Sequence, residues 1–253
     1  MTGYVSDKTS ESDSSSPQYI ICELHVCLRN IQFLTYFPLV PVNIFNTSVN
    51  RTTIAVAGDD YVICAGCTRM STGYEIISRT QKKLFELTDQ TVLCAVGCNS
   101  DIITLRRLLD ARLTQYQHAE GKPMSSHAAA QLLSVTLYYR RFFPYYAFNL
   151  IGGLDDEGKG AVYGYDAVGS YKRDDYGAMG SGQNFVIPIL DNLFGHKNRQ
   201  DEKKPIPAEE AVRMIKDIYI IAAERDIHTG DNVEIKIIRK DGITTETFPL
   251  KKD

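Results

Sequence analysis

The chain has 253 residues, of which 43 % are hydrophobic and 23 % are charged, and its formal net charge is −3. This composition is typical of globular proteins and excludes collagen-like, low-complexity and largely disordered classes. Nucleic-acid binding is not expected, because it usually depends on a basic excess. No apolar run is long enough to span a bilayer, so we expect no membrane partner.

The first 50 residues differ in composition from the rest. Residues 1–17 are rich in Ser, Asp and Thr and should be disordered, while residues 18–48 are more apolar and contain Pro38 and Pro41. A basic segment followed by an apolar run, the mark of a signal peptide, is missing. We therefore expect a partly disordered N-terminal extension at 1–50 ahead of one folded domain at 51–253.

Two hairpins are predicted at the start of the folded part. Each consists of two short runs rich in β-branched and apolar residues, separated by a turn of acidic or glycine residues. The runs are 52–57 with 61–66, around Gly58-Asp59-Asp60, and 84–88 with 91–96, around Asp89-Gln90.

The apolar period then changes from two to about 3.6 residues, which predicts two helices. The first is expected to start at an N-cap Ser100, and the second to follow Ser125 or Ser126 and to stop before Pro144. The expected inward side chains are Ile102, Leu105, Leu109, Leu113 and Tyr116 in the first helix, and Ala129, Leu132, Leu133, Thr136 and Tyr139 in the second.

Strands and helices alternate once more in the second half. A third helix is expected near 184–194, with Pro188 delaying or bending it, and a fourth opens at Pro207, a residue favoured in a first turn. The fourth helix should bury Ala211, Met214, Ile215, Ile218 and Ile221. The expected strands are 147–151, 160–165, 177–180, 232–239 and 243–250.

This order predicts an α+β protein. Strands joined by short turns pair antiparallel, and two helix pairs inserted between three strand blocks need two helical layers. The economical arrangement is a four-layer αββα sandwich, in which two antiparallel sheets lie face to face between helix pairs.

Several common sites do not fit the sequence. Cys64 and Cys67, with Cys94 and Cys98, superficially match a four-cysteine zinc site, but no tight Gly or Pro turn holds the first pair. The glycine pairs lie in turns between strands, not at a strand-to-helix junction that would cradle a phosphate. We expect no metal and no cofactor, and we expect most of the cysteines to be small buried residues in a reducing compartment.

N-terminal nucleophile chemistry fits better. It uses a Thr, Ser or Cys whose free amine acts as the base for its own side chain, and Thr52-Thr53-Ile54-Ala55-Val56 looks like the first strand of such enzymes. The order of elements also agrees with their four-layer fold.

Four stretches carry a specific family resemblance. They are Ala57–Asp60, Lys82–Asp89, the run from Arg140 through Asp155 and Tyr163 to Tyr171, and Ala222–Asp226 with Thr229–Asp231. With them, residues 51–253 resemble the beta subunits of the 20S proteasome, most closely the non-catalytic beta-6 class, also called beta type-1. The resemblance implies the N-terminal nucleophile hydrolase fold.

The resemblance also implies a degenerate catalytic pocket. Arg51 stands at the position of the nucleophilic Thr, and Cys67 replaces an acidic residue. Four further pocket positions retain a compatible residue, and they are Lys83, Ser181, Asp226 and Thr229. With the nucleophile gone, these residues are interpreted as structural: a buried Lys–Asp pair, a cap and a turn.

The implied role is that of a non-catalytic subunit in the cytoplasm and nucleus. Its implied partners are the other beta subunits of a seven-membered ring, the opposing beta ring and the alpha rings, and neighbouring subunits perform ATP- and ubiquitin-dependent degradation. Aromatic residues near the end of the second helix are divided between core and interface. Two alternatives stay open: Thr52 becomes an active nucleophile after processing, and residues 1–50 are either a prosegment or the product of a mis-assigned start.

Overall fold

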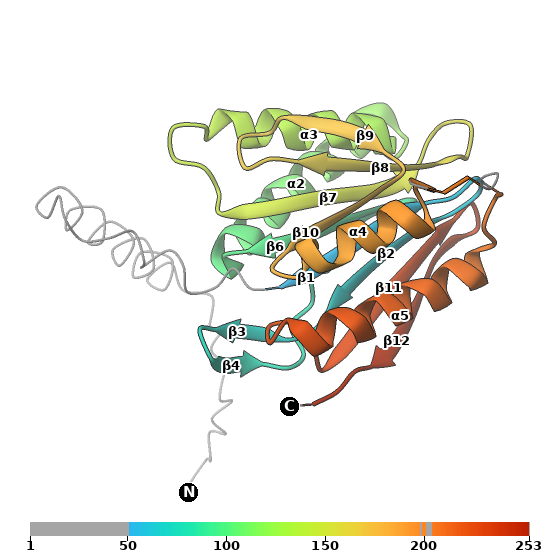
Figure 1. The fold of residues 1–253 in the computed structure, drawn as a ribbon. Coiled ribbons are helices and arrows are strands. Elements are labelled where there is room, and N and C mark those ends of the chain that lie inside the picture. The colour runs from blue at the N-terminus through green and yellow to red at the C-terminus, as the bar shows by residue number, and fades with distance from the viewer. Residues whose placement is uncertain (1–50, 198, 201–203, 253) are drawn as a thin grey trace, which may run out of the picture. The chain divides into compact units, whose positions relative to one another are not determined.

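The computed structural model describes residues 51–197, 199–200 and 204–252. Within this part of the chain, two five-stranded antiparallel sheets and a separate two-stranded hairpin are formed (Figure 1). The expected extension at 1–50 lies outside the described residues.

The first sheet has the order β10-β1-β2-β11-β12, so the strand that begins the folded part lies inside the sheet rather than at its edge. Its strands are β1 (Thr52–Ala57), β2 (Val62–Cys67), β10 (Tyr176–Gly180), β11 (Asn232–Arg239) and β12 (Gly242–Pro249). The pairing places Thr52 opposite Gly180 and Thr53 opposite Gly66, which fixes the start of β1 against both neighbours.

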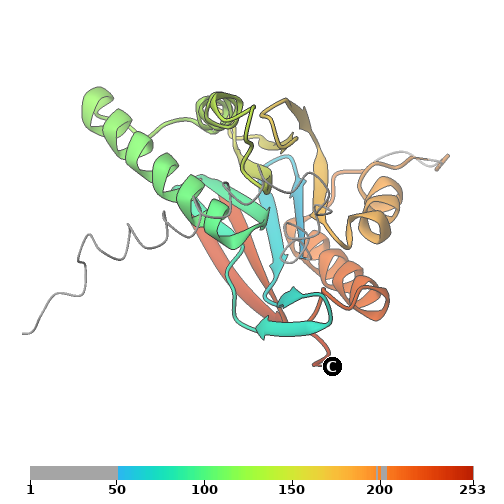
Figure 2. The same cartoon turned by 90° about the vertical axis from the view of Figure 1, so that its left-hand side faces the viewer.

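The second sheet has the order β5-β6-β7-β8-β9. Its strands are β5 (Leu84–Thr88), β6 (Thr91–Gly97), β7 (Ala147–Leu154), β8 (Gly160–Tyr165) and β9 (Tyr171–Asp174). The hairpin of β3 (Met70–Thr72) and β4 (Glu75–Ser78) follows β2 and lies near the carboxyl terminus in Figure 2.

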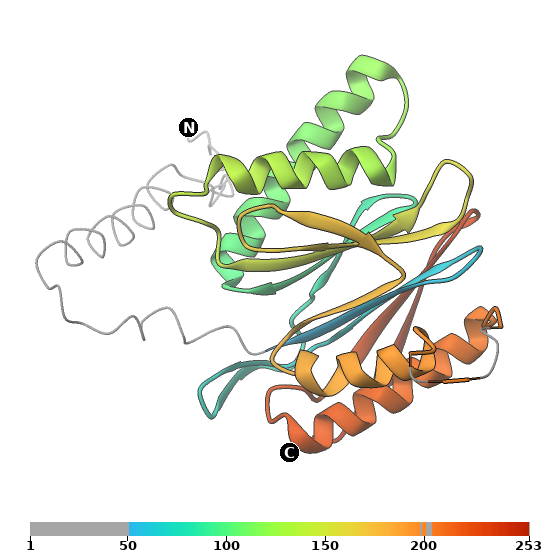
Figure 3. The same ribbon diagram turned by 45° about the horizontal axis from the view of Figure 1, so that its top comes forward.

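Helices cover the outer face of each sheet. α2 (Asn99–Glu120) and α3 (Ser126–Tyr139) pack on the second sheet, and α4 (Gln183–Leu193) and α5 (Ala208–Arg225) pack on the first. Figure 3 shows the resulting order of layers, with helices above and below the two sheets. The predicted α+β, four-layer αββα sandwich is therefore confirmed.

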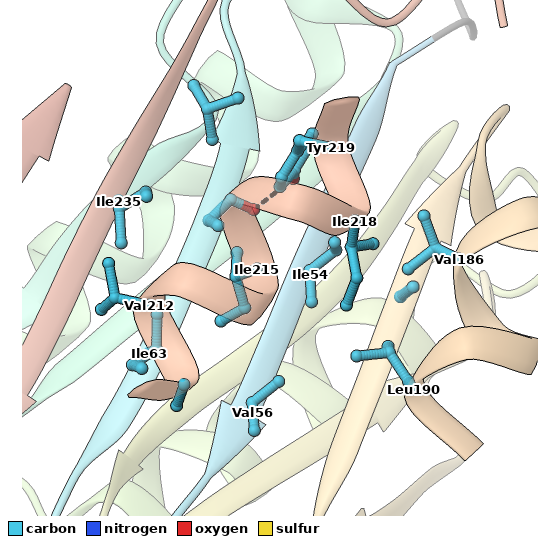
Figure 4. Packing of buried hydrophobic residues seen from close by; sticks show 14 of the residues in the cluster. Ile54, Val56, Ile63, Val186, Leu190, Val212, Ile215, Ile218, Tyr219 and Ile235 are labelled. Atoms are coloured by element: carbon cyan, nitrogen blue, oxygen red, sulfur yellow. Dashed lines mark hydrogen bonds between the residues drawn. The ribbon is translucent and has the colours of Figure 1, made fainter. Parts of the chain in front are cut away.

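Three apolar clusters separate the layers, and β1 contributes to two of them. Ile54 and Val56 point toward α4 and α5, where they meet Ile215 and Ile218 of α5 (Figure 4). Ala55, between them in the strand, belongs instead to the cluster between the sheets. This alternation follows from the two-residue period of a strand, and it also decides which way each residue at the start of β1 points.

Close approach of the sheets explains one glycine of the Gly152-Gly153 pair. A side chain at Gly152 would place its Cβ 2.5 Å from the Sγ of Cys64 in the opposite sheet. The predicted turn at Gly152-Gly153 is wrong, because both glycines lie within β7, where Gly152 is required by the packing of the sheets.

Some predicted details are wrong. The N-cap of α2 is Cys98, two residues before the expected Ser100. Tyr139 is 81 % exposed and Ile221 is 51 % exposed, although both were expected inside. Tyr139 is the last residue of α3, and Tyr219, which is fully buried, occupies the inward face of α5 that the prediction gave to Ile221.

Three short strands were not predicted. β3 and β4 pair only with each other, and β9 is an edge strand, so none of them carries the buried apolar alternation that marks a strand in sequence. The third helix contains Pro188 as expected and begins at Gln183, one residue early. No helix among the described residues is long and apolar enough to cross a membrane.

Candidate functional site

The six residues of the predicted pocket come from five places in the chain that meet around the start of β1. Arg51 precedes β1, Cys67 ends β2, and Lys83 precedes β5. Ser181 lies in the turn between β10 and α4, and the loop between α5 and β11 carries Asp226 and Thr229. The antiparallel pairing of β1 with β2 and β10 brings the first and fourth of these places together.

Lys83 is 1 % exposed and makes three hydrogen bonds. Its Nζ donates to the carbonyl oxygen of Cys67, to the Sγ of Cys67 at 2.9 Å and to the carbonyl oxygen of Arg69 at 2.8 Å. Burial lowers the pKa of Lys83, and the nearby Arg51 lowers it further, while Cys67 and Asp231 oppose the shift. The expected buried Lys–Asp pair is wrong, because the hydrogen bonds of Lys83 go to Cys67 and Arg69 and to no carboxylate.

Arg51 is also 1 % exposed. Its backbone oxygen accepts a hydrogen bond from the backbone N–H of Ser181 at 3.0 Å. The Nε and Nη2 of its guanidinium group have no hydrogen-bond partner among the described residues. Burial lowers the pKa of Arg51, while Cys67 and Cys98 act in the opposite direction, so both cysteines lie near the guanidinium.

A chain of hydroxyl groups leads from Thr52 to a carboxylate. The Oγ1 of Thr229 donates to Oδ2 of Asp226 at 2.7 Å, and the Thr52 and Thr229 hydroxyls are 2.8 Å apart. Since the proton of Thr229 is directed at Asp226, the hydroxyl of Thr52 donates to Thr229. Ser181 donates to the same Oδ2 at 2.7 Å, and the backbone N–H of Gly182 donates to Oγ1 of Thr52 at 3.0 Å.

The pocket residues therefore form two groups. Arg51 and Lys83 lie on the side of β1 that looks toward the second sheet, whereas Ser181, Asp226 and Thr229 surround Thr52 on the helix-facing side. Cys67 belongs to the helix-facing apolar cluster and connects the two groups, because its Sγ accepts from Lys83 at 2.9 Å and lies 4.0 Å from the carbonyl oxygen of His228. Moving one residue along a strand reverses the direction of the side chain, so the side chains of Arg51 and Thr52 point to opposite sides of the sheet. The hydroxyl of Thr52 has its hydrogen bonds with Thr229 and Gly182, not with Lys83.

An ion pair beneath the α5–β11 loop holds Asp226 and Thr229 in place. Asp231 accepts from Nε of Arg69 at 3.0 Å and also bonds Arg79, and both Asp231 and Arg69 are buried. Arg69 donates in addition to the carbonyl oxygen of Ile227 at 2.8 Å. Sequence reasoning gave this pair no role, since residues 162 positions apart show no local pattern.

Among the described cysteines, Cys64, Cys67 and Cys94 are buried and Cys98 is half-buried. Cys64 and Cys94 hydrogen-bond to each other across the space between the sheets, and this contact and burial raise the pKa of Cys94. Among the described residues, no group of three or more His, Cys, Asp or Glu side chains is arranged to hold a metal ion.

Comparison with known proteins gives a consistent family. The model of the "Proteasome subunit" family matches residues 48–238. "Proteasome subunit beta type-1" of Danio rerio is 51 % identical over 203 residues, covering 80 % of this chain and 86 % of the relative. The Arabidopsis thaliana protein of the same name is 50 % identical over 207 residues, covering 80 % of this chain and 93 % of the relative.

A more distant relative is named beta type-6 instead of beta type-1. "Probable proteasome subunit beta type-6" of Schizosaccharomyces pombe is 40 % identical over 211 residues, covering 80 % of this chain and 94 % of the relative. The family match, the identities and the four-layer fold agree with one another. This chain therefore belongs to the proteasome subunit family, as a beta subunit of the 20S proteasome.

Proposed function

We propose that this beta subunit is non-catalytic and structural. A proteasome beta subunit assembles with other subunits into a threonine-type protease complex. In the proposal, this chain closes a seven-membered beta ring, contacts the opposing beta ring and an alpha ring, and shapes the chamber in which neighbouring subunits perform ATP- and ubiquitin-dependent degradation. The particle acts in the cytoplasm and the nucleus.

One observation carries the proposal: the side chain that stands beside Lys83 at the start of β1 belongs to Arg51. An N-terminal nucleophile needs a hydroxyl or thiol that loses its proton and attacks a carbonyl carbon. A guanidinium group stays protonated and has no free electron pair to offer. Cys67 adds no carboxylate to the pocket. In the proposal, both the nucleophilic Thr and the acidic residue of the catalytic pocket are therefore replaced.

The exposed surface supports a role in assembly. Four large aromatic side chains are exposed where α3 ends, and the guanidinium group of Arg141 lies over two of them. They are Tyr138, Tyr139, Phe142 and Phe143. Contiguous exposed aromatic side chains mark interaction sites, because aromatic residues and Arg are enriched at the cores of interfaces.

The second candidate is a threonine peptidase that uses Thr52 after cleavage of the bond between Arg51 and Thr52. The observation that favours it is the hydroxyl chain from Thr52 through Thr229 to Asp226, with the N–H of Gly182 on the Thr52 oxygen. Against it, Thr52 is fully buried and its hydroxyl points away from Lys83, so no substrate carbonyl reaches it.

A labelling experiment on the native particle separates the two candidates. The purified particle is incubated with a peptide vinyl sulfone, which captures an N-terminal Thr, and the intact masses of all subunits are measured. We expect no adduct on this chain and no start at Thr52, while catalytic subunits in the same sample carry adducts and provide the control. An adducted chain that begins at Thr52 would establish the second candidate, and a lone monomer would refute assembly.

A further inference from the structure

The pocket around Arg51 and Lys83 contains two buried basic side chains, and in the part of the chain that the structure describes no carboxylate bonds either of them. The Nζ of Lys83 donates its hydrogen bonds to two carbonyl oxygens and a sulfur. The nearest carboxylate that influences Lys83, Asp231, is already bonded to Arg69 and Arg79. Burying charge without an opposite charge is costly, so such a site favours any anion that can enter it.

The free atoms of Arg51 indicate the shape of this anion. Nε and Nη2 lie on one edge of the planar guanidinium group, and both are buried without a partner. This edge donates two parallel N–H bonds at the spacing of the two oxygens of a carboxylate. A spherical halide would use only part of this edge. Cys98, which is half-buried and near Arg51, places the pocket close to the protein surface.

From these observations we infer that the degenerate pocket binds a small free carboxylate, held by the Nε–Nη2 edge of Arg51 and by the positive charge of Lys83. The site depends on an Arg at the start of β1 and on a thiol, that of Cys67, beside Lys83. It concerns binding and not peptide cleavage, so it does not rest on the catalytic status of the subunit.

Acetate serves as the probe in a thermal unfolding experiment on the purified full chain. Sodium acetate replaces sodium chloride mole for mole at constant pH, which keeps the ionic strength unchanged. A ligand that binds only the folded state raises Tm, and at ten times its dissociation constant the rise should be about 3–6 °C for a chain of this size. The rise should saturate, and isothermal titration calorimetry should show one site.

Three variants connect the effect to the pocket. Arg51→Leu removes the two donors and should abolish the rise, whereas Arg141→Gln, at an exposed Arg near the end of α3, should leave it unchanged. Cys67→Asp builds a carboxylate next to Lys83. It should raise Tm without acetate and eliminate the response to acetate, because the internal carboxylate takes the place of the ligand.

The inference is overturned if the wild-type chain shows no saturable response, which is the outcome expected if Cys67 itself supplies the negative charge. It is also overturned if Arg51→Leu responds to acetate like the wild type. If Arg51→Leu does not fold, the Cys67→Asp variant tests the inference instead. An acetate response of Cys67→Asp equal to that of the wild type would then refute the assignment.

Discussion

The ion pair of Asp231 gives the sharpest test of how the α5–β11 loop is held. The substitution Asp231→Asn removes the negative charge and leaves the guanidinium of Arg69 buried. The backbone of residue 231 has a φ of 67°, and Asn tolerates this left-handed conformation, so the variant changes the charge without adding backbone strain. The effect is therefore assigned to the lost pairing.

The burial of the pair determines the magnitude. The side chain of Arg69 is 5 % exposed and that of Asp231 is 1 % exposed. Removing one partner from a buried ion pair costs about 3–5 kcal/mol, because the remaining charge has no compensation. For a chain of this length, such a loss lowers Tm by about 6–20 °C.

Urea unfolding of the purified full chain, followed by circular dichroism, measures this loss directly. Arg239→Gln is the matched control, since it breaks an ion pair between Arg239 and Glu209 whose side chains are 46 % and 69 % exposed. We expect no measurable change for this control, because solvent screens the pair. If Asp231→Asn unfolds within about 1 kcal/mol of the wild type, the buried pair does not hold the loop and the reasoning fails.

Three further outcomes are expected from the same unfolding measurements. Gly180→Ala should lower the free energy of unfolding by more than about 2 kcal/mol, because φ is +109° and the new Cβ would lie 1.5 Å from the backbone oxygen of Arg51. The control Gly164→Ala, whose new Cβ would lie 3.6 Å from its nearest neighbour, should stay within about 1 kcal/mol of the wild type. Tyr219→Phe should cost about 1–3 kcal/mol, since the lost hydroxyl bonds the carbonyl oxygens at Thr52 and Ala65; an unchanged midpoint would show that these oxygens need no donor. Burial and the charge of Arg69 lower the pKa of His228 below 6.5, so the unfolded chain binds the proton more readily than the folded chain. The free energy of unfolding should therefore fall as the pH drops through 6.5, and His228→Gln should lessen this fall. Equal pH profiles for the variant and the wild type would refute the assignment.

Much of the architecture follows from patterns that are local in the sequence. The short apolar run at 52–57 reflects a strand that is buried on both faces, and the helical period at 102–116 reflects burial of one face of a helix. The short strands β3, β4 and β9 were not predicted because they bury few side chains. The hairpin of β3 and β4 exposes Tyr74 almost completely, so it carries no apolar period that could be detected.

The identities of the pocket residues were also available from the sequence, through the spacing of Arg51, Cys67 and Lys83 within a recognisable family pattern. Their partners were not. Lys83 was expected to pair with an Asp, but it bonds Cys67 and Arg69. Which side chains meet across two sheets depends on strand order and register, and no local window of sequence contains this information.

By itself, the sequence determined the order of the elements, the four-layer class and the resemblance that predicts Arg51 at the position of the nucleophile. Only the tertiary structure decided that the pocket is divided by β1. Arg51 and Lys83 lie on one side of this strand, and Thr52, Thr229 and Asp226 lie on the other. The physical reason is that successive side chains of a strand point in opposite directions, while the groups that bond the Thr52 hydroxyl come from segments more than a hundred residues away.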